Sequence, residues 1–172
     1  KGISRIGFVI GKAQIDRSDP ENEAQMNAIK EKLLSIVGNR FSTLNGISVI
    51  GYASPDGTYR RNALLAQDRT DMVLKEVVSA LPEDVRKYVK LSSMSVVEPW
   101  SSVAKLMAAD SLESASAVQE IVTKYGDDYV NTQNAVRRLP DYKEVIAKDY
   151  LPRLRRVEYE INSTEFRNLT VP

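Results

Sequence analysis

The sequence contains no cysteine and no histidine among its 172 residues. The absence of cysteine excludes disulfides and thiolate nucleophiles, and the absence of histidine excludes an imidazole base and a Ser-His-Asp triad. A zinc site built from cysteine or histidine ligands is excluded as well. Any catalysis would have to depend on carboxylates, lysine, tyrosine or a bound ion, and the sequence predicts no cofactor.

An excess of one charge and long apolar runs are also missing. Twenty-four Lys and Arg residues balance 23 Asp and Glu residues, which leaves a formal net charge of +1. This balance argues against nucleic acid as a partner, because nucleic-acid binding depends on neutralising phosphates with Lys and Arg. No run of about 18 apolar residues predicts a membrane span. With 42% apolar and 27% charged residues, the composition is that of a globular domain.

The first part of the chain predicts a strand, a helix and a second strand. Ile3–Ile10 is rich in β-branched residues and is followed by a glycine, which favours a buried strand. Asp19 and Pro20 supply an N-cap and a favoured first helical residue, and apolar residues then recur at helical spacing up to Gly38. Ile47–Tyr52 predicts a short strand that leads directly into a Ser-Pro-Asp-Gly turn at 54–57.

The rest of the chain predicts a second helix, two further strands and a helical insertion between them. Tyr59–Leu81 has no glycine or proline and carries an apolar stripe, which predicts a second helix, and Val89–Val97 predicts a less regular strand. Short helical patterns from about 99 to 151 predict a helical insertion. Arg156–Asn162 alternates strictly, which is typical of a strand with one solvated face. The tail at 163–172 has no period and is expected to be loose.

Together these elements predict an α/β fold, an α+β sandwich with the order β-α-β-α-β-(helical insert)-β. Helices between consecutive strands favour parallel pairing, because a parallel connection requires a crossover of that length. We therefore expect one mixed four-stranded sheet with helices packed on one face. The expected organisation is a single domain over residues 1–172 with an insertion at about 99–151.

The stretch around the turn at 54–57 carries the most specific pattern in the chain. It resembles the signature of the OmpA-like peptidoglycan-binding family, which reads G-[HY]-T-D-x-x-G-[ST] and then N-x-x-L-S-x-x-R-[AS]-x-x-V. The two registers coincide without a gap, and Thr58 is a permitted variant. The positions with matching residue types are Gly51, Gly57, Asn62, Leu65, Arg69 and Val73.

Other segments agree with this resemblance in the same order. Phe8 in the first predicted strand resembles the opening strand of the family, and Arg-Arg-Val-Glu at 155–158 resembles its closing strand. The resemblance covers Ile3–Val97 and Pro152–Asn162. A helical elaboration and a G-Y-A-S-P-[DE]-G loop are similar to those of one lineage of these envelope proteins.

The resemblance implies a periplasmic domain that ties an outer-membrane protein to the cell wall. In the family, the domain grips diaminopimelate in the peptidoglycan stem peptide without covalent chemistry. The end of the diaminopimelate side chain is a zwitterion, so it calls for one cation, one anion and backbone donors on the protein. The resemblance assigns the cation to Arg69, implies a wall-binding role for Arg155, and places the family aspartate at the position of Ser54.

Ser54 is the main departure from the family pattern. A hydroxyl that binds an ammonium group lacks the charge-assisted part of the hydrogen bond, on the order of 1 kcal/mol or more. Either the affinity for the usual ligand is lower or the ligand differs. Asp56 lies two residues further on and is our candidate for the substitute carboxylate, because residues two apart share a side in extended chain. The predicted ligand-binding residues are Ser54, Asp56, Gly57, Asn62, Arg69 and Arg155.

Several of these residues also have a purely structural interpretation. Gly57 fits a turn position with positive φ, and Asn62 fits a residue that ties the loop to the helix start. Arg69 would pair with Asp56 or Asp68 in a domain without a ligand. This alternative is weaker for Arg69, because a cation at the loop end of the sheet needs an explanation.

For two other features the structural interpretation is favoured. The arginines at 153, 155 and 156 are more often a solvated strand entry, and a wall-binding role for Arg155 or Arg156 rests on the resemblance. Trp100 follows a proline and could stack on a sugar ring, but a single tryptophan at a helix start is more often part of the core. We therefore predict that Trp100 is buried.

Three classes of function are compatible with the sequence. The first is a non-catalytic peptidoglycan-binding module. The second is an envelope assembly or protein-interaction domain of the same fold that has lost or altered diaminopimelate recognition, with the insertion as its surface for other envelope proteins. The third, a carboxylate-based glycan hydrolase, ranks last because no spacing nominates a pair of acidic residues. The sequence leaves open whether the domain forms a homodimer.

Overall fold

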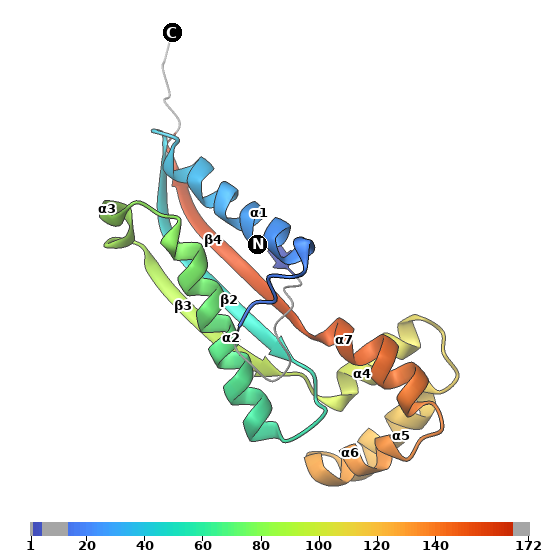
Figure 1. The fold of residues 1–172 in the computed structure, drawn as a ribbon. Coiled ribbons are helices and arrows are strands. Elements are labelled where there is room, and N and C mark those ends of the chain that lie inside the picture. Colours follow the sequence, from blue (N-terminus) through green and yellow to red (C-terminus); the bar gives the residue numbers. More distant parts are fainter. Residues whose placement is uncertain (1, 5–13, 167–172) are drawn as a thin grey trace. The chain divides into compact units, whose positions relative to one another are not determined.

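The computed structural model describes residues 2–4 and 14–166, and Figure 1 shows their fold. The chain divides into two compact units, each assembled from segments that are separate in the sequence. The sheet unit consists of Lys1–Gly51, Gln67–Met94 and Val157–Pro172. The helical unit consists of Tyr52–Ala66 and Ser95–Arg156. The predicted insertion at about 99–151 falls within the helical unit.

The sheet has the strand order β1-β4-β2-β3. Three strands are long and β1 is short, with the bounds β1 (Gly2–Ser4), β2 (Ser42–Ala53), β3 (Lys90–Val97) and β4 (Arg156–Glu165). β1 pairs antiparallel with β4, whereas β2 and β3 run in the same direction and β4 runs opposite to them (Figure 1). The predicted α/β class and mixed sheet are confirmed. The prediction of four full strands is not confirmed, because most of the predicted strand Ile3–Ile10 lies outside the described residues.

Two helices of the sheet unit cover one face of the sheet, as Figure 1 shows. They are α1 (Pro20–Val37) and the part of α2 (Tyr59–Ser79) that belongs to this unit, and a short α3 (Glu83–Arg86) follows. The Asp19 side chain caps α1 by accepting a hydrogen bond from the backbone N–H of Glu21, and Gly38 ends the helix. The predicted boundaries of α1 are therefore confirmed.

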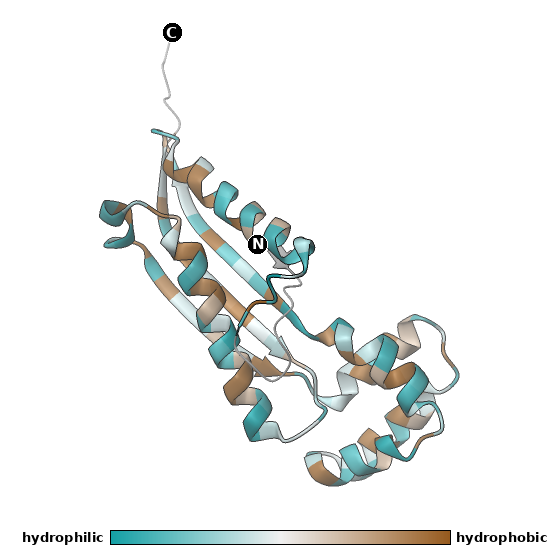
Figure 2. Ribbon diagram, viewed as in Figure 1, coloured by the Kyte–Doolittle hydropathy of each residue, from teal (hydrophilic) through white to brown (hydrophobic). Residues whose placement is uncertain are grey.

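The core of the sheet unit lies between these helices and the sheet. Met26 and Leu33 of α1 are fully buried, and Ile47 of β2 and Val77 of α2 are 1% exposed. Along β4, alternate residues beginning at Val157 pack against this core, as the strict alternation predicts. Figure 2 shows the alternation of apolar and polar residues along the helices and strands. Burial of each of these apolar side chains stabilises the folded state by about 1.5–3 kcal/mol relative to leaving it exposed.

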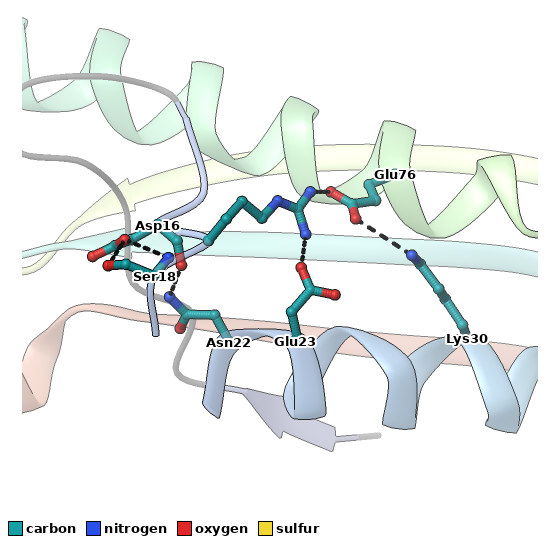
Figure 3. Close-up of polar contacts among 7 residues, drawn as sticks. Asp16, Ser18, Asn22, Glu23, Lys30 and Glu76 are labelled. Atoms are coloured by element: carbon teal, nitrogen blue, oxygen red, sulfur yellow. Dashed lines mark hydrogen bonds and ion pairs between the residues drawn. The ribbon is translucent and has the colours of Figure 1, made fainter. Parts of the chain in front are cut away.

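A charged network connects the segment before α1 with α1 and α2, as Figure 3 shows. Arg17 pairs with Glu23 of α1 and with Glu76 of α2, and Lys30 Nζ lies 3.3 Å from Glu76 Oε1. Burial raises the pKa of Glu76, but the hydrogen bonds from Arg17 and Lys30 outweigh it and lower that pKa below its usual value of 4.5. The network therefore cross-links the two helices while the Glu76 carboxylate stays ionised.

The helical unit has its own core. The patterns predicted at 99–151 form α4 (Trp100–Ala109), α5 (Ala115–Tyr125), α6 (Tyr129–Arg137), the π-helix η1 (Tyr142–Tyr150) and α7 (Leu151–Leu154). Gly126 separates α5 from α6 with a φ of +56°. Met107 and Ile146 are completely buried, and Trp100 is 3% exposed, so its predicted place in the core is confirmed. None of the described helices combines the length and apolarity that a membrane span needs.

Two predicted strands are longer in the structure than the sequence indicates. β2 begins at Ser42 rather than Ile47, and β4 continues to Glu165, so 163–165 are not a loose tail. The added residues are mostly polar and exposed, so they lack the hydrophobic alternation by which a strand is predicted. They are held by contacts with each other, since Asn45 Nδ2 donates a hydrogen bond to Thr164 Oγ1 at 2.7 Å. Residues 167–172 lie outside the described residues.

Candidate functional site

The turn at 54–57 (Ser54, Pro55, Asp56 and Gly57) connects the end of β2 to the start of α2 and belongs to the helical unit. Gly57 has a φ of +96°, a conformation that residues with a β-carbon rarely adopt. A β-carbon at this position would also lie 3.4 Å from the Asn62 side chain. The positive φ predicted for Gly57 is therefore confirmed.

Asn62 ties the turn to the first turn of α2. Its side-chain amide donates hydrogen bonds to the backbone carbonyls of Asp56 and Ser54, the second at 3.4 Å. These are the contacts that the structural interpretation of Asn62 predicts. Asn62 therefore stabilises the conformation of the turn through these two hydrogen bonds.

Arg155 contacts two side chains of the turn. It lies between α7 and β4, in extended backbone. Its Nε donates a hydrogen bond to Ser54 Oγ at 2.9 Å, and its Nη2 lies 3.4 Å from Asp56 Oδ2. Ser54 Oγ in turn donates to Asp56 Oδ1. The structure thus brings together Ser54, Asp56 and Arg155, three of the residues that the sequence predicted as ligand-binding.

The Arg155–Asp56 pair is only partly occupied by these contacts. A guanidinium group has five N–H donors, and among the described residues no partner is present for Nη1 of Arg155. The Arg155 side chain is 47% exposed and that of Asp56 is 28% exposed. The Asp56 oxygens each accept one hydrogen bond and have a further lone pair. The turn therefore presents a cation and an anion side by side to the solvent.

The other two arginines of the cluster are engaged elsewhere. Arg153 Nη1 lies 2.7 Å from Asp110 Oδ2. The Arg156 guanidinium lies 3.8 Å from the centroid of the Tyr52 ring, and its Nη1 lies 3.0 Å from Glu98 Oε1. Their contacts fit the structural interpretation of the cluster. Arg155 donates hydrogen bonds to two side chains of the turn.

Two side chains of helix α6 in the insertion form hydrogen bonds with the backbone of the turn. The buried side chain of Gln133 accepts a hydrogen bond from the backbone N–H of Gly57 and donates one to its carbonyl at 3.1 Å. The Tyr129 hydroxyl donates to the carbonyl of Pro55. Burial raises the pKa of Tyr129, which keeps this hydroxyl protonated and able to donate. The backbone of the turn is thus fixed by the insertion.

Sequence reasoning missed Gln133 and Tyr129. They lie more than 70 positions from the turn residues that they contact, and no local motif joins the two segments. One signal was available: Gln133 is a polar residue three positions before Val136, on the face of α6 that Val136 places in the core. A buried amide must find hydrogen-bond partners, but the sequence did not show which.

Arg69, the cation assigned by the family resemblance, lies on the segment of α2 that belongs to the sheet unit. It is partly buried and has interaction partners of its own. Within the helical unit, Arg155 is a cation that contacts the turn.

No protein-family model matches the sequence, and a search of curated proteins finds no match. Within residues 2–4 and 14–166, no group of three or more acidic side chains is arranged to hold a metal ion. The geometry of the turn and the motif that surrounds it are therefore the basis for a functional proposal.

Proposed function

We propose that this chain is a non-catalytic, OmpA-like binding domain that holds the diaminopimelate end of the peptidoglycan stem peptide at the turn 54–57. The observation that carries the proposal is the partly exposed Arg155–Asp56 pair at the turn that also carries the motif resembling the family signature. In this role the chain is a periplasmic domain that anchors an outer-membrane-associated protein to the cell wall.

The chemistry of the pair suits a zwitterion. Nη1 of Arg155, which has no partner within residues 14–166, is available to a ligand carboxylate, and the remaining lone pairs of Asp56 are available to a ligand ammonium group. Ser54 orients the Asp56 carboxylate by donating to it, so the anion of the motif is displaced from position 54 to position 56. Recognition then survives the loss of the family aspartate.

The expected affinity is modest. Hydrogen bonds to charged groups contribute about 1.5–3 kcal/mol each, and the exposure of both side chains puts this pair at the lower end. Two such bonds correspond to a dissociation constant in the millimolar range for a free ligand. The wall presents many copies of the stem peptide, so a domain that dissociates meets a high local concentration of ligand and rebinds.

The test is a titration, followed by NMR, with two synthetic stem tripeptides that differ only in the third residue. One carries diaminopimelate and the other carries lysine, which has no carboxylate at the end of its side chain. We expect wild-type protein to prefer the diaminopimelate peptide at low salt. Arg155→Gln and Asp56→Asn should each weaken its binding by about tenfold, the equivalent of one charge-assisted hydrogen bond.

Arg153→Gln is the matched control, because Arg153 is similarly exposed and pairs with Asp110. It should bind like the wild type. Equal binding of the two peptides by the wild type, or unchanged binding after Arg155→Gln, would contradict the proposal. Arg69→Ala tests the assignment from the family pattern separately.

A second candidate function is favoured by a different observation. Gln133 occupies the backbone N–H and carbonyl of Gly57, and Tyr129 occupies the carbonyl of Pro55, so these groups are not offered to a ligand. This arrangement suits an envelope assembly domain in which the helical insertion contacts other envelope proteins. Failure of the wild type to sediment with purified sacculi at low salt would favour this second function over the first.

A further inference from the structure

We infer that Tyr59 forms a second subsite beside the turn, where its ring stacks against a sugar of the glycan strand that carries the stem peptide. The inference rests on the proposed function and extends it from a peptide end to a glycopeptide. The ligand class is a pyranose ring with an apolar C–H face.

Tyr59 is exposed, yet its ring is held in place. It is the first residue of α2 and is 55% exposed. Its ring meets the Tyr129 ring edge to face, with centroids 5.5 Å apart and an interplanar angle of 82°. Tyr129 is itself fixed to the turn, because its hydroxyl donates to the Pro55 carbonyl. The Tyr59 ring thus packs against the residue that also contacts the turn.

A fixed, exposed aromatic ring is suited to a sugar. The faces of the tyrosine ring are apolar, and its hydroxyl can form hydrogen bonds with water. One ring face can therefore cover the apolar side of a pyranose at the edge of a polar site. Because Tyr129 already restricts the ring, less side-chain entropy is lost on binding. Trp100, the residue that the sequence suggested could stack on a sugar ring, is buried and cannot serve as the platform.

The spacing agrees with a single glycopeptide. Tyr59 follows Asp56 by three residues, so their Cα atoms lie at most about 11 Å apart. In the stem peptide, diaminopimelate is the third residue from the sugar, so its backbone lies roughly 10 Å from the sugar in an extended chain and its side-chain zwitterion lies further away. A bent glycopeptide can therefore place its zwitterion at Asp56 and Arg155 and its sugar at Tyr59.

The experiment compares two ligands, the free diaminopimelate tripeptide and the same tripeptide attached to its disaccharide. Each is titrated into the wild type and into the variants Tyr59→Leu, Tyr59→Phe and Tyr88→Leu. Leucine keeps an apolar contact with Tyr129 but removes the aromatic face, and phenylalanine keeps the face. Tyr88 is the matched control, since it is 84% exposed and belongs to the sheet unit.

We expect the wild type to bind the glycopeptide at least fivefold more tightly than the peptide. Tyr59→Leu should abolish this preference and leave peptide binding within twofold of wild type, whereas Tyr59→Phe and Tyr88→Leu should retain the preference. Equal binding of both ligands by the wild type, or a preference that survives Tyr59→Leu, overturns the inference and leaves the proposed function standing. Failure to bind either ligand overturns both.

Discussion

Replacing Gln133 tests whether the insertion holds the turn. Gln133→Met preserves the length of the side chain but removes its contacts with both backbone groups of Gly57. A neutral hydrogen bond contributes about 0.5–1.5 kcal/mol net, so the loss of two should make local opening of the turn easier by about 1–3 kcal/mol. Since 1.4 kcal/mol corresponds to a factor of ten, opening should become roughly 5- to 150-fold more frequent.

Hydrogen exchange of the Gly57 amide measures this opening directly, because that N–H donates to the Gln133 side chain. The control is Gln119→Met on α5, whose side chain is exposed and contacts Thr123 in its own helix. Exchange at Gly57 should stay within about twofold of wild type in the control, since exposed substitutions usually change stability by less than 0.5 kcal/mol. An equally small change in Gln133→Met would refute the role assigned to Gln133.

Three other changes have defined outcomes. Glu76→Gln should destabilise the protein at pH 7. This loss of stability should fade as the pH falls below 4.5 and through the lowered folded-state pKa of Glu76, because the wild-type carboxyl then becomes protonated as well. Urea unfolding at pH 7 and at acidic pH measures the difference. Met107→Ala should cost about 2–5 kcal/mol by the same method, whereas Met94→Ala, at a side chain that is 55% exposed, should cost less than about 1 kcal/mol. Gly57→Ala should cost about 1–3 kcal/mol because of its positive φ, and a neutral result would contradict that conformation.

Local signals in the sequence predicted much of the fold. The Asp19 cap, the Gly38 stop and the alternation after Arg156 were read correctly, because each depends on residues within a few positions of one another. The extensions of β2 and β4 were missed because they depend on cross-strand contacts between polar residues, such as that of Asn45 with Thr164. Such contacts leave no periodic trace in either segment.

In the candidate site, too, the local features were predicted and the contacts between distant segments were not. The turn itself and the positive φ of Gly57 were predicted, since turn chemistry is local. The contacts of Arg155 and Gln133 with the turn join segments that lie far apart in the sequence, and only the folded chain shows them. The family pattern drew attention to Arg155, but it contained no information about Gln133, which belongs to the insertion.

The division of the chain into interleaved segments has a consequence for the order of events during synthesis. Every segment of the helical unit has been synthesised by residue 156, whereas nearly all of β4 in the sheet unit has still to be made at that point. Because β4 lies between β1 and β2, its absence leaves β2 with an unpaired edge and an incomplete core. A nascent chain stopped in this interval would expose an aggregation-prone strand edge. Rapid translation or chaperone binding is therefore most important for avoiding aggregation while β4 is being made.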